Sequence, residues 1–211
     1  MAQRLVLLVA LLLGAGSAYA GSYTLNFQGF QQGGWQEGYP YFGNINGGPT
    51  IYIMCDDYAH GGVPGQTWQV NFTNLGSNDL TFVRFNQLSG APTLYDEAGW
   101  ILLQTLSTPM SEWTDMNGAV WHIFDSGAPL DQGAQNWLNL AQLAAANNFP
   151  NTDFHNVGIY TPVDQYDSDL NDPQEMLAVM PSDPPGNIPE PATLVLLSTG
   201  LAGLVARKLL S

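Results

Sequence analysis

The chain has 211 residues, 45% of them hydrophobic, a length and composition typical of a globular protein with a single core. Its charge is unbalanced, because residues 21–191 hold all 18 acidic side chains and one basic side chain, Arg84, for a formal charge of −17. Such a domain repels phosphate groups, so its composition argues against nucleic-acid binding and against docking on an anionic membrane surface. Divalent cations, cationic partners and neutral glycans remain compatible with this charge.

The first twenty residues have the three parts of a secretory signal peptide. Arg4 supplies the positive charge, residues 5–13 form an apolar run, and Ala18 and Ala20 form the small-residue cleavage site. We therefore expect passage through the Sec translocon and cleavage by signal peptidase, so that the mature chain begins at Gly21.

Three segments in the first third of the chain have the composition of β-strands. Residues 22–28 alternate apolar and polar side chains, and residues 50–55 and 67–73 are rich in β-branched and aromatic residues. Between the first two, a segment rich in glycine, tyrosine and asparagine, with turn signals such as Asn46-Gly47-Gly48, is predicted to be a long loop.

The middle of the domain has helical periodicity, and strand patterns return after it. Helices are predicted over residues 95–106, around residues 119–124 with Asp115 as the N-cap, and over residues 131–146. In the third helix the predicted inward face consists of Trp137, Leu140, Ala141 and Ala144. Strands are expected at residues 156–161 and 175–180. The sequence therefore predicts an α+β domain over residues 21–180, an antiparallel β-sheet or sandwich with two or three inserted helices.

The C-terminal part is built as a spacer, an apolar segment and a basic end. Residues 181–191 contain five prolines and predict an extended spacer. Residues 192–206 carry no charge and would form a helix of about 22 Å, a short transmembrane helix against a hydrocarbon core of about 30 Å. Arg207 and Lys208 should keep the tail, residues 207–211, in the cytoplasm by the positive-inside rule, which leaves the acidic domain outside.

Pro189-Glu190-Pro191, the apolar segment and the basic end resemble the PEP-CTERM sorting signal. The resemblance implies recognition and cleavage near the Pro-Glu-Pro motif by an exosortase-type sorting protease. It further implies a Gram-negative-type bacterium that makes an exopolysaccharide or biofilm matrix. The protein would lie transiently in the inner membrane, held by its C-terminal helix, before it reaches the cell surface or the matrix.

Cys55 is the single cysteine of the chain, so no disulfide can form within it. It ends an apolar strand, which fits a small buried hydrophobic residue. The alternative is the nucleophile of a cysteine hydrolase, which would require His60, His122 or His155 to meet the thiol.

Two segments resemble the signature segments of bacterial thioester domains of the TQXA type. Ile-Met-Cys-Asp-Asp, which contains Cys55, and Asn-Gly-Ala-Val-Trp, which begins at Asn117, correspond to the Cys segment and to the Gln-x-Ala-Ile-Trp-like helix of that family. The resemblance implies that Cys55 and Asn117 form a thioester-like pair. Asn117 stands where the family has Gln, and its side chain is one methylene shorter.

An acidic loop near the end of the domain contains a weak calcium-binding pattern. Asp167, Asp169 and Asn171 have the spacing of the first three oxygen ligands of a calcium loop. Asp172 stands where such a loop needs glycine, and no glutamate occupies its last position, so a solvated acidic loop is the alternative. No zinc site and no cofactor are expected, because His and Cys do not cluster at ligand spacing.

These observations predict a non-catalytic surface or matrix protein that is sorted through its C-terminus. Its expected role is adhesion or structural association with exopolysaccharide. The alternative is a secreted hydrolase that uses Cys55 or a pair of carboxylates that the sequence does not reveal.

Overall fold

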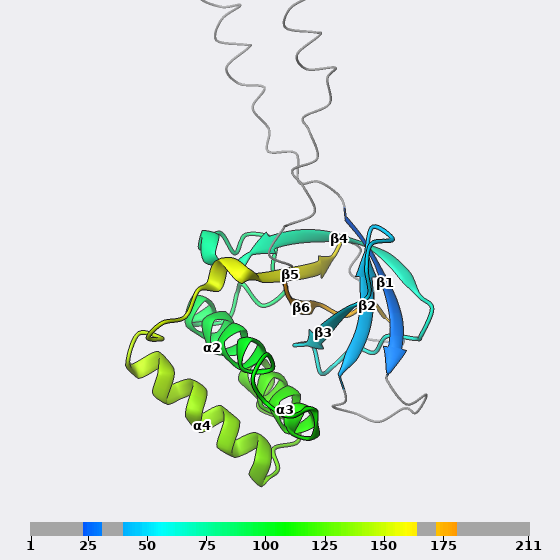
Figure 1. The fold of residues 1–211 in the computed structure, drawn as a ribbon. Helices are drawn as coiled ribbons and strands as arrows, with labels where there is room; N and C mark the ends of the chain where they lie inside the picture. The colour runs from blue at the N-terminus through cyan, green and yellow to red at the C-terminus, as the bar shows by residue number, and fades with distance from the viewer. Residues whose placement is uncertain (1–22, 31–39, 164–171, 181–211) are drawn as a thin grey trace, which may run out of the picture. The chain divides into compact units, whose positions relative to one another are not determined.

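The computed structural model describes residues 23–30, 40–163 and 172–180. The chain divides into two units after Val179, and all described residues except Met180 lie in the first unit. Six strands and three α-helices are found among the described residues (Figure 1). The strands are β1 Tyr23–Phe30, β2 Tyr41–Ile45, β3 Ile51–Cys55, β4 Thr67–Asn74, β5 Val157–Pro162 and β6 Met176–Val179. The helices are α2 Ala91–Gln104, α3 Trp113–Phe124 and α4 Gln132–Ala146.

The six strands form a closed barrel in the order β1-β2-β3-β6-β5-β4, and every neighbouring pair is antiparallel. The three helices lie between β4 and β5 in sequence. The prediction of an α+β domain with an antiparallel sheet and inserted helices is therefore confirmed, and the sheet closes on itself.

The segment predicted as a long loop contains β2, so that part of the prediction is wrong. Tyr41 lies in the barrel core and Ile45 packs against it, and β2 pairs with both β1 and β3. The turn signal that follows was correctly recognised: Asn46 (φ 53°) and Gly47 (φ 70°) have the left-handed conformation that reverses the chain into β3. Glycine and asparagine within and around a five-residue strand obscured its alternation.

The three helices form a layer on one side of the barrel (Figure 1). α2 and α3 contact the barrel through β6 and β3, and α4 packs on α2 and α3. α2 starts at Ala91, earlier than predicted, with Pro92 in its first turn. Asp115 does not cap α3 as predicted, because Glu112 holds the N-cap position without a side-chain hydrogen bond and Asp115 lies in the first turn.

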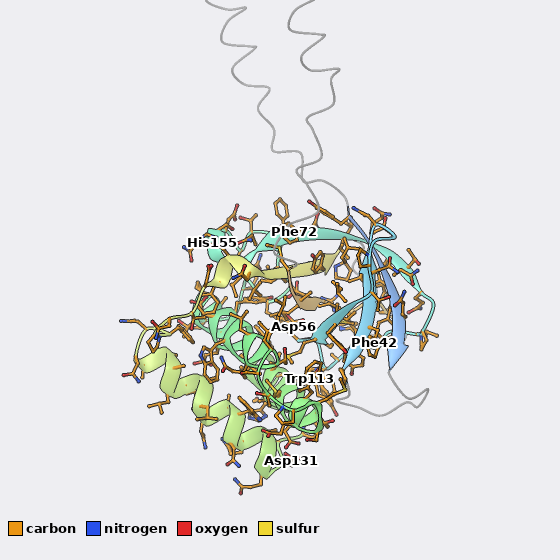
Figure 2. All side chains as sticks on the ribbon, in the orientation of Figure 1. Phe42, Asp56, Phe72, Trp113, Asp131 and His155 are labelled. Carbon is orange, nitrogen blue, oxygen red and sulfur yellow. The ribbon has the colours of Figure 1, made fainter. Side chains whose placement is uncertain are left out.

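The buried face of α4 differs from the predicted one. Ala134, Leu138 and Ala141 are buried, whereas Leu140 is 46% exposed. The spacing of the buried residues is i, i+4 and i+7, which also fits a helical period. The N-cap of this helix is Asp131 (Figure 2), whose carboxylate accepts a hydrogen bond from the Ala134 N–H at 2.8 Å.

Two hydrophobic cores meet at β3 because successive side chains of a strand point to opposite faces. Ile53 and Cys55 belong to the core inside the barrel, together with Trp121, which reaches in from α3. Met54 belongs to the second core, between barrel and helices.

Several sequence predictions concern residues outside the described part. They are the signal peptide with Ala18 and Ala20, the calcium pattern at Asp167, Asp169 and Asn171, and the whole C-terminal part with its Pro-Glu-Pro motif, apolar segment, Arg207 and Lys208. Among the described helices, none is both long enough and apolar enough to cross a membrane.

Candidate functional site

The residues singled out by the sequence lie around the C-terminal end of β3, where strand, loop and α3 meet. Cys55 is the last residue of β3, and its side chain is fully buried in the barrel core. The thiol donates a hydrogen bond to the backbone oxygen of Asp57 and accepts one from the Asp57 N–H, each at 3.3 Å. Burial raises the pKa of the Cys55 thiol, the charge of Asp56 raises it further, and the indole of Trp121 acts in the opposite direction.

Asn117 lies on α3 and contacts the backbone of Cys55. Its side chain is almost fully buried, and its amide nitrogen donates a hydrogen bond to the backbone oxygen of Cys55 at 2.9 Å. The structure therefore brings the two residues of the predicted thioester-like pair together. Their contact joins the amide to the backbone carbonyl, while the thiol is bonded to Asp57.

Next to this contact, a small hollow of about 10 Å³, which has room for about one water molecule, lies between β3 and the helices α2 and α3. Asn117 lines it, although its exposed fraction is 2%. Because the amide nitrogen is bonded to Cys55, the side-chain oxygen is the end of Asn117 that remains to accept a hydrogen bond. The lining residues are Pro40, Tyr52, Ile53, Met54, Leu102, Thr105, Trp113 and Asn117, none of which is charged.

Two of the lining residues, Tyr52 and Trp113, are aromatic and pack against each other, and Phe42 lies beside Tyr52. The ring centroid of Tyr52 lies 5.1 Å from that of Phe42 and 5.0 Å from that of Trp113, with Tyr52 and Trp113 edge to face. Figure 2 labels Phe42 and Trp113, which come from the barrel and from the helical layer. The Trp113 indole donates to the Thr108 backbone oxygen at 3.1 Å, which fixes its ring. Tyr52 is 47% exposed and could offer an aromatic surface to a ligand.

A polar network follows β3 on the other side of Cys55. Arg84 forms an ion pair with the carboxylate of Asp57. Nδ1 of His60 lies 2.8 Å from Oδ1 of Asp57 and 2.9 Å from Nη1 of Arg84. The single basic side chain of the domain is thus used to neutralise Asp57, which is 1% exposed.

The structure also reveals a pair of acidic residues that sequence reasoning missed. Asp56 follows β3, Glu175 precedes β6, and both side chains have zero exposure. Their positions gave no signal, because the two strands come from opposite ends of the domain and only the β3–β6 register places them opposite each other.

The contacts that a cysteine hydrolase would need are not formed. His60 bonds to Asp57, and Nδ1 of His122 lies 3.1 Å from the backbone oxygen of Ala128. Within the described ranges no histidine forms a hydrogen bond with the thiol of Cys55. Nor does any group of three His, Cys, Asp or Glu residues in those ranges gather as a metal site.

Residues 187–208 match the model of the PEP-CTERM protein-sorting motif. The resemblance of the C-terminus to this sorting signal is therefore confirmed. A motif of this kind implies an exported protein that is processed by an exosortase-type system and sorted to the cell surface. No curated protein is significantly similar to the chain in sequence.

Among solved structures, bacterial thioester domains are similar to this chain at 11–12% identity, each covering 74% of it. The N-terminal thioester domain of a surface protein from Clostridium perfringens has a TM-score of 0.45 and is covered to 97% of its length. The N-terminal domain of the Streptococcus pyogenes pilus tip adhesin Cpa gives 0.46 and 92%, and the N-terminal thioester domain of the fibronectin-binding protein SfbI from the same organism gives 0.44 and 91%. Similarities at this level leave the chemistry of this chain to be decided by its own residues.

Proposed function

We propose that this exported protein is a non-catalytic component of the cell surface or extracellular matrix that associates with neutral exopolysaccharide. The sorting motif at residues 187–208 is the observation that carries the proposal, because a motif of this kind implies sorting to the cell surface, where a secreted polymer would be within reach. The formal charge of −17 on residues 21–191 makes an uncharged polymer a more suitable partner than an anionic one.

The aromatic rim of the hollow beside Asn117, formed by Tyr52 and Trp113, is the proposed contact with the polymer. A sugar ring offers apolar C–H groups, which pack against aromatic side chains, and hydroxyl groups, which need hydrogen-bond acceptors. Tyr52 and Trp113 supply the aromatic surface, and the side-chain oxygen of Asn117 supplies a buried acceptor of fixed position. The association is non-covalent, because the Asn117 amide and the Cys55 thiol are each engaged with backbone groups.

Co-sedimentation of the full-length chain with purified exopolysaccharide from its host tests this proposal. Tyr52→Ala should weaken binding about two- to twelvefold, the equivalent of an aromatic contact worth about 0.5–1.5 kcal/mol. Phe82→Ala is the matched control, because Phe82 is a similarly exposed aromatic residue, at 51% against 47%, that does not line the hollow.

The outcomes distinguish the location of the contact from the binding of the polymer itself. Equal binding by both variants would place the contact outside the hollow. If the unmodified protein does not sediment with the polymer at all, the exopolysaccharide role is wrong, whereas sorting through residues 187–208 is unaffected.

A further inference from the structure

Two acidic residues continue the β3–β6 ladder beyond its last pair. The register pairs Met54 with Leu177 and Cys55 with Met176, so the next residues along the two strands are Asp56 and Glu175. Like charges directly opposite each other on antiparallel strands destabilise a sheet. Here both side chains are also fully buried, and a buried charge without compensation is costly.

The hydrogen-bond donors around the pair all point to Glu175. Its Oε1 accepts from the Tyr95 hydroxyl at 2.5 Å, and its Oε2 accepts from the Arg84 backbone N–H at 2.8 Å and from the Thr161 hydroxyl. Three donors stabilise a charged carboxylate at this position.

Asp56, which is labelled in Figure 2, receives no such hydrogen bonds from the described residues. Within the described part of the chain, neither of its carboxyl oxygens has a hydrogen-bond partner of regular geometry. The guanidinium of Arg84, which could neutralise it, is bonded to Asp57. The β3–β6 register places Glu175 next to Asp56 at the end of the ladder. Two carboxyl groups can form a hydrogen bond with each other only when one of them carries a proton.

We propose that Asp56 and Glu175 share a single proton in the folded domain, carried by Asp56, so that this end of the barrel is a proton-binding site. While the pair holds the proton, the proton joins the two groups and holds the ends of β3 and β6 together. When the pair releases the proton to water, two buried negative charges oppose each other and this end of the barrel is weakened. The inference does not depend on what the domain binds.

The electrostatic surroundings support this assignment. Burial raises the pKa of Asp56 well above its ordinary value, the charge of Glu175 raises it further, and the backbone amide of Asp56 and the charge of Arg84 oppose these effects. The titratable and charged groups that surround the pair come from β3, the segments that follow it, α2 and the start of β6. They are Cys55, Asp57, His60, Arg84 and Tyr95 around the pair, and Glu175 within it.

The sign of the pH dependence follows from linkage. With the pKa of Asp56 raised in the folded state, the folded domain holds one proton more than the unfolded chain at every pH between the unfolded and folded pKa values. Stability therefore falls as the pH rises through this window, by up to about tenfold in the unfolding constant per pH unit for one proton.

Urea unfolding of the full-length chain in mild detergent, followed by tryptophan fluorescence from about pH 5 to about pH 8, measures this slope. We expect Asp56→Asn to reduce the pH dependence of the unfolding free energy by the equivalent of one proton. At the alkaline end of the range this variant should be more stable than the unmodified chain. Asp131→Asn is the matched control, because asparagine serves equally well as an N-cap and removes an exposed charge. The unfolding free energy of this control should depend on pH as strongly as that of the unmodified chain.

Infrared spectroscopy reports the proton itself, including in the unmodified chain. We expect the band of a protonated carboxylic acid to be present at neutral pH, to persist in Asp131→Asn and to be absent from Asp56→Asn. If the unmodified chain lacks this band at neutral pH, the pair carries no proton and the proposal is overturned, whether or not the Asp56 variant folds. An unchanged slope in a folded Asp56→Asn variant would overturn it as well.

Discussion

The reactivity of Cys55 distinguishes a structural thiol from a covalent binding group. The side chain has zero exposure, and burial raises the pKa of the thiol, so little of the reactive thiolate is present at neutral pH. An alkylating reagent can reach the sulfur only when the barrel opens. For a domain of ordinary stability, about 5–15 kcal/mol, opening protects the thiol at least about a thousandfold relative to the unfolded chain.

The assay compares the rate of thiol alkylation in buffer with that in denaturant and records the intact mass of the protein. We expect slow labelling of the native protein, complete labelling when it is unfolded, and the mass of a free thiol. Cys55→Ser should cost about 1–3 kcal/mol of unfolding free energy, because a more polar hydroxyl replaces the thiol in an apolar core. Export should be unaffected, because the sorting motif lies at residues 187–208.

Two results would refute this reasoning. Native labelling at nearly the unfolded rate would show that the thiol is accessible. A mass short by one ammonia, restored by Cys55→Ser or Asn117→Ala, would show that thiol and amide had condensed to a thioester. The domain would then bind covalently.

Further predictions concern the other side chains and the ends of the chain. Asn117→Ala should cost about 1–3 kcal/mol of unfolding free energy, because the Cys55 backbone oxygen loses its buried donor. Asp131→Ala should cost about 1 kcal/mol through the lost N-cap and Asp131→Asn almost nothing, both measured by urea unfolding. N-terminal sequencing of exported protein should find Gly21, and a start at Met1 would contradict the signal peptide. Deleting residues 189–211 should leave the melting transition unchanged, since a proline-rich spacer separates them from the domain.

The sequence predicted the elements whose pattern is local. Five of the six strands and all three helices follow from alternation or helical periodicity, and each lies within a few residues of its expected position. β2 was missed because Gly43 and Asn44 interrupt its apolar pattern, and the strand is visible only through its pairing with β1 and β3. The inward face of α4 was misjudged for a similar reason: which of two overlapping apolar stripes is buried depends on where α2 and α3 lie.

In the candidate site too, the sequence predicted what has a local signal and missed what depends on how the chain folds. The proximity of Cys55 and Asn117 was expected from a resemblance in two short segments, and a hydrogen bond does connect the two residues. The pairing of Asp56 with Glu175 had no counterpart in the sequence, because it depends on the register between β3 and β6. The hollow could not be anticipated either, since its lining comes from a strand and two helices that meet only in the folded protein.

The use of Arg84 as the partner of Asp57 has a consequence for proteolysis. A protease that cuts after lysine or arginine finds a single target between residues 21 and 191, the bond between Arg84 and Phe85. The Arg84 side chain is 12% exposed and held in an ion pair, so this bond is protected while the domain is closed. When opening and closing are fast relative to cleavage, the rate of cutting measures the population of the open form. The domain therefore carries a built-in reporter, in which the rate of one cut, giving two fragments, measures how often the polar network beside β3 is open.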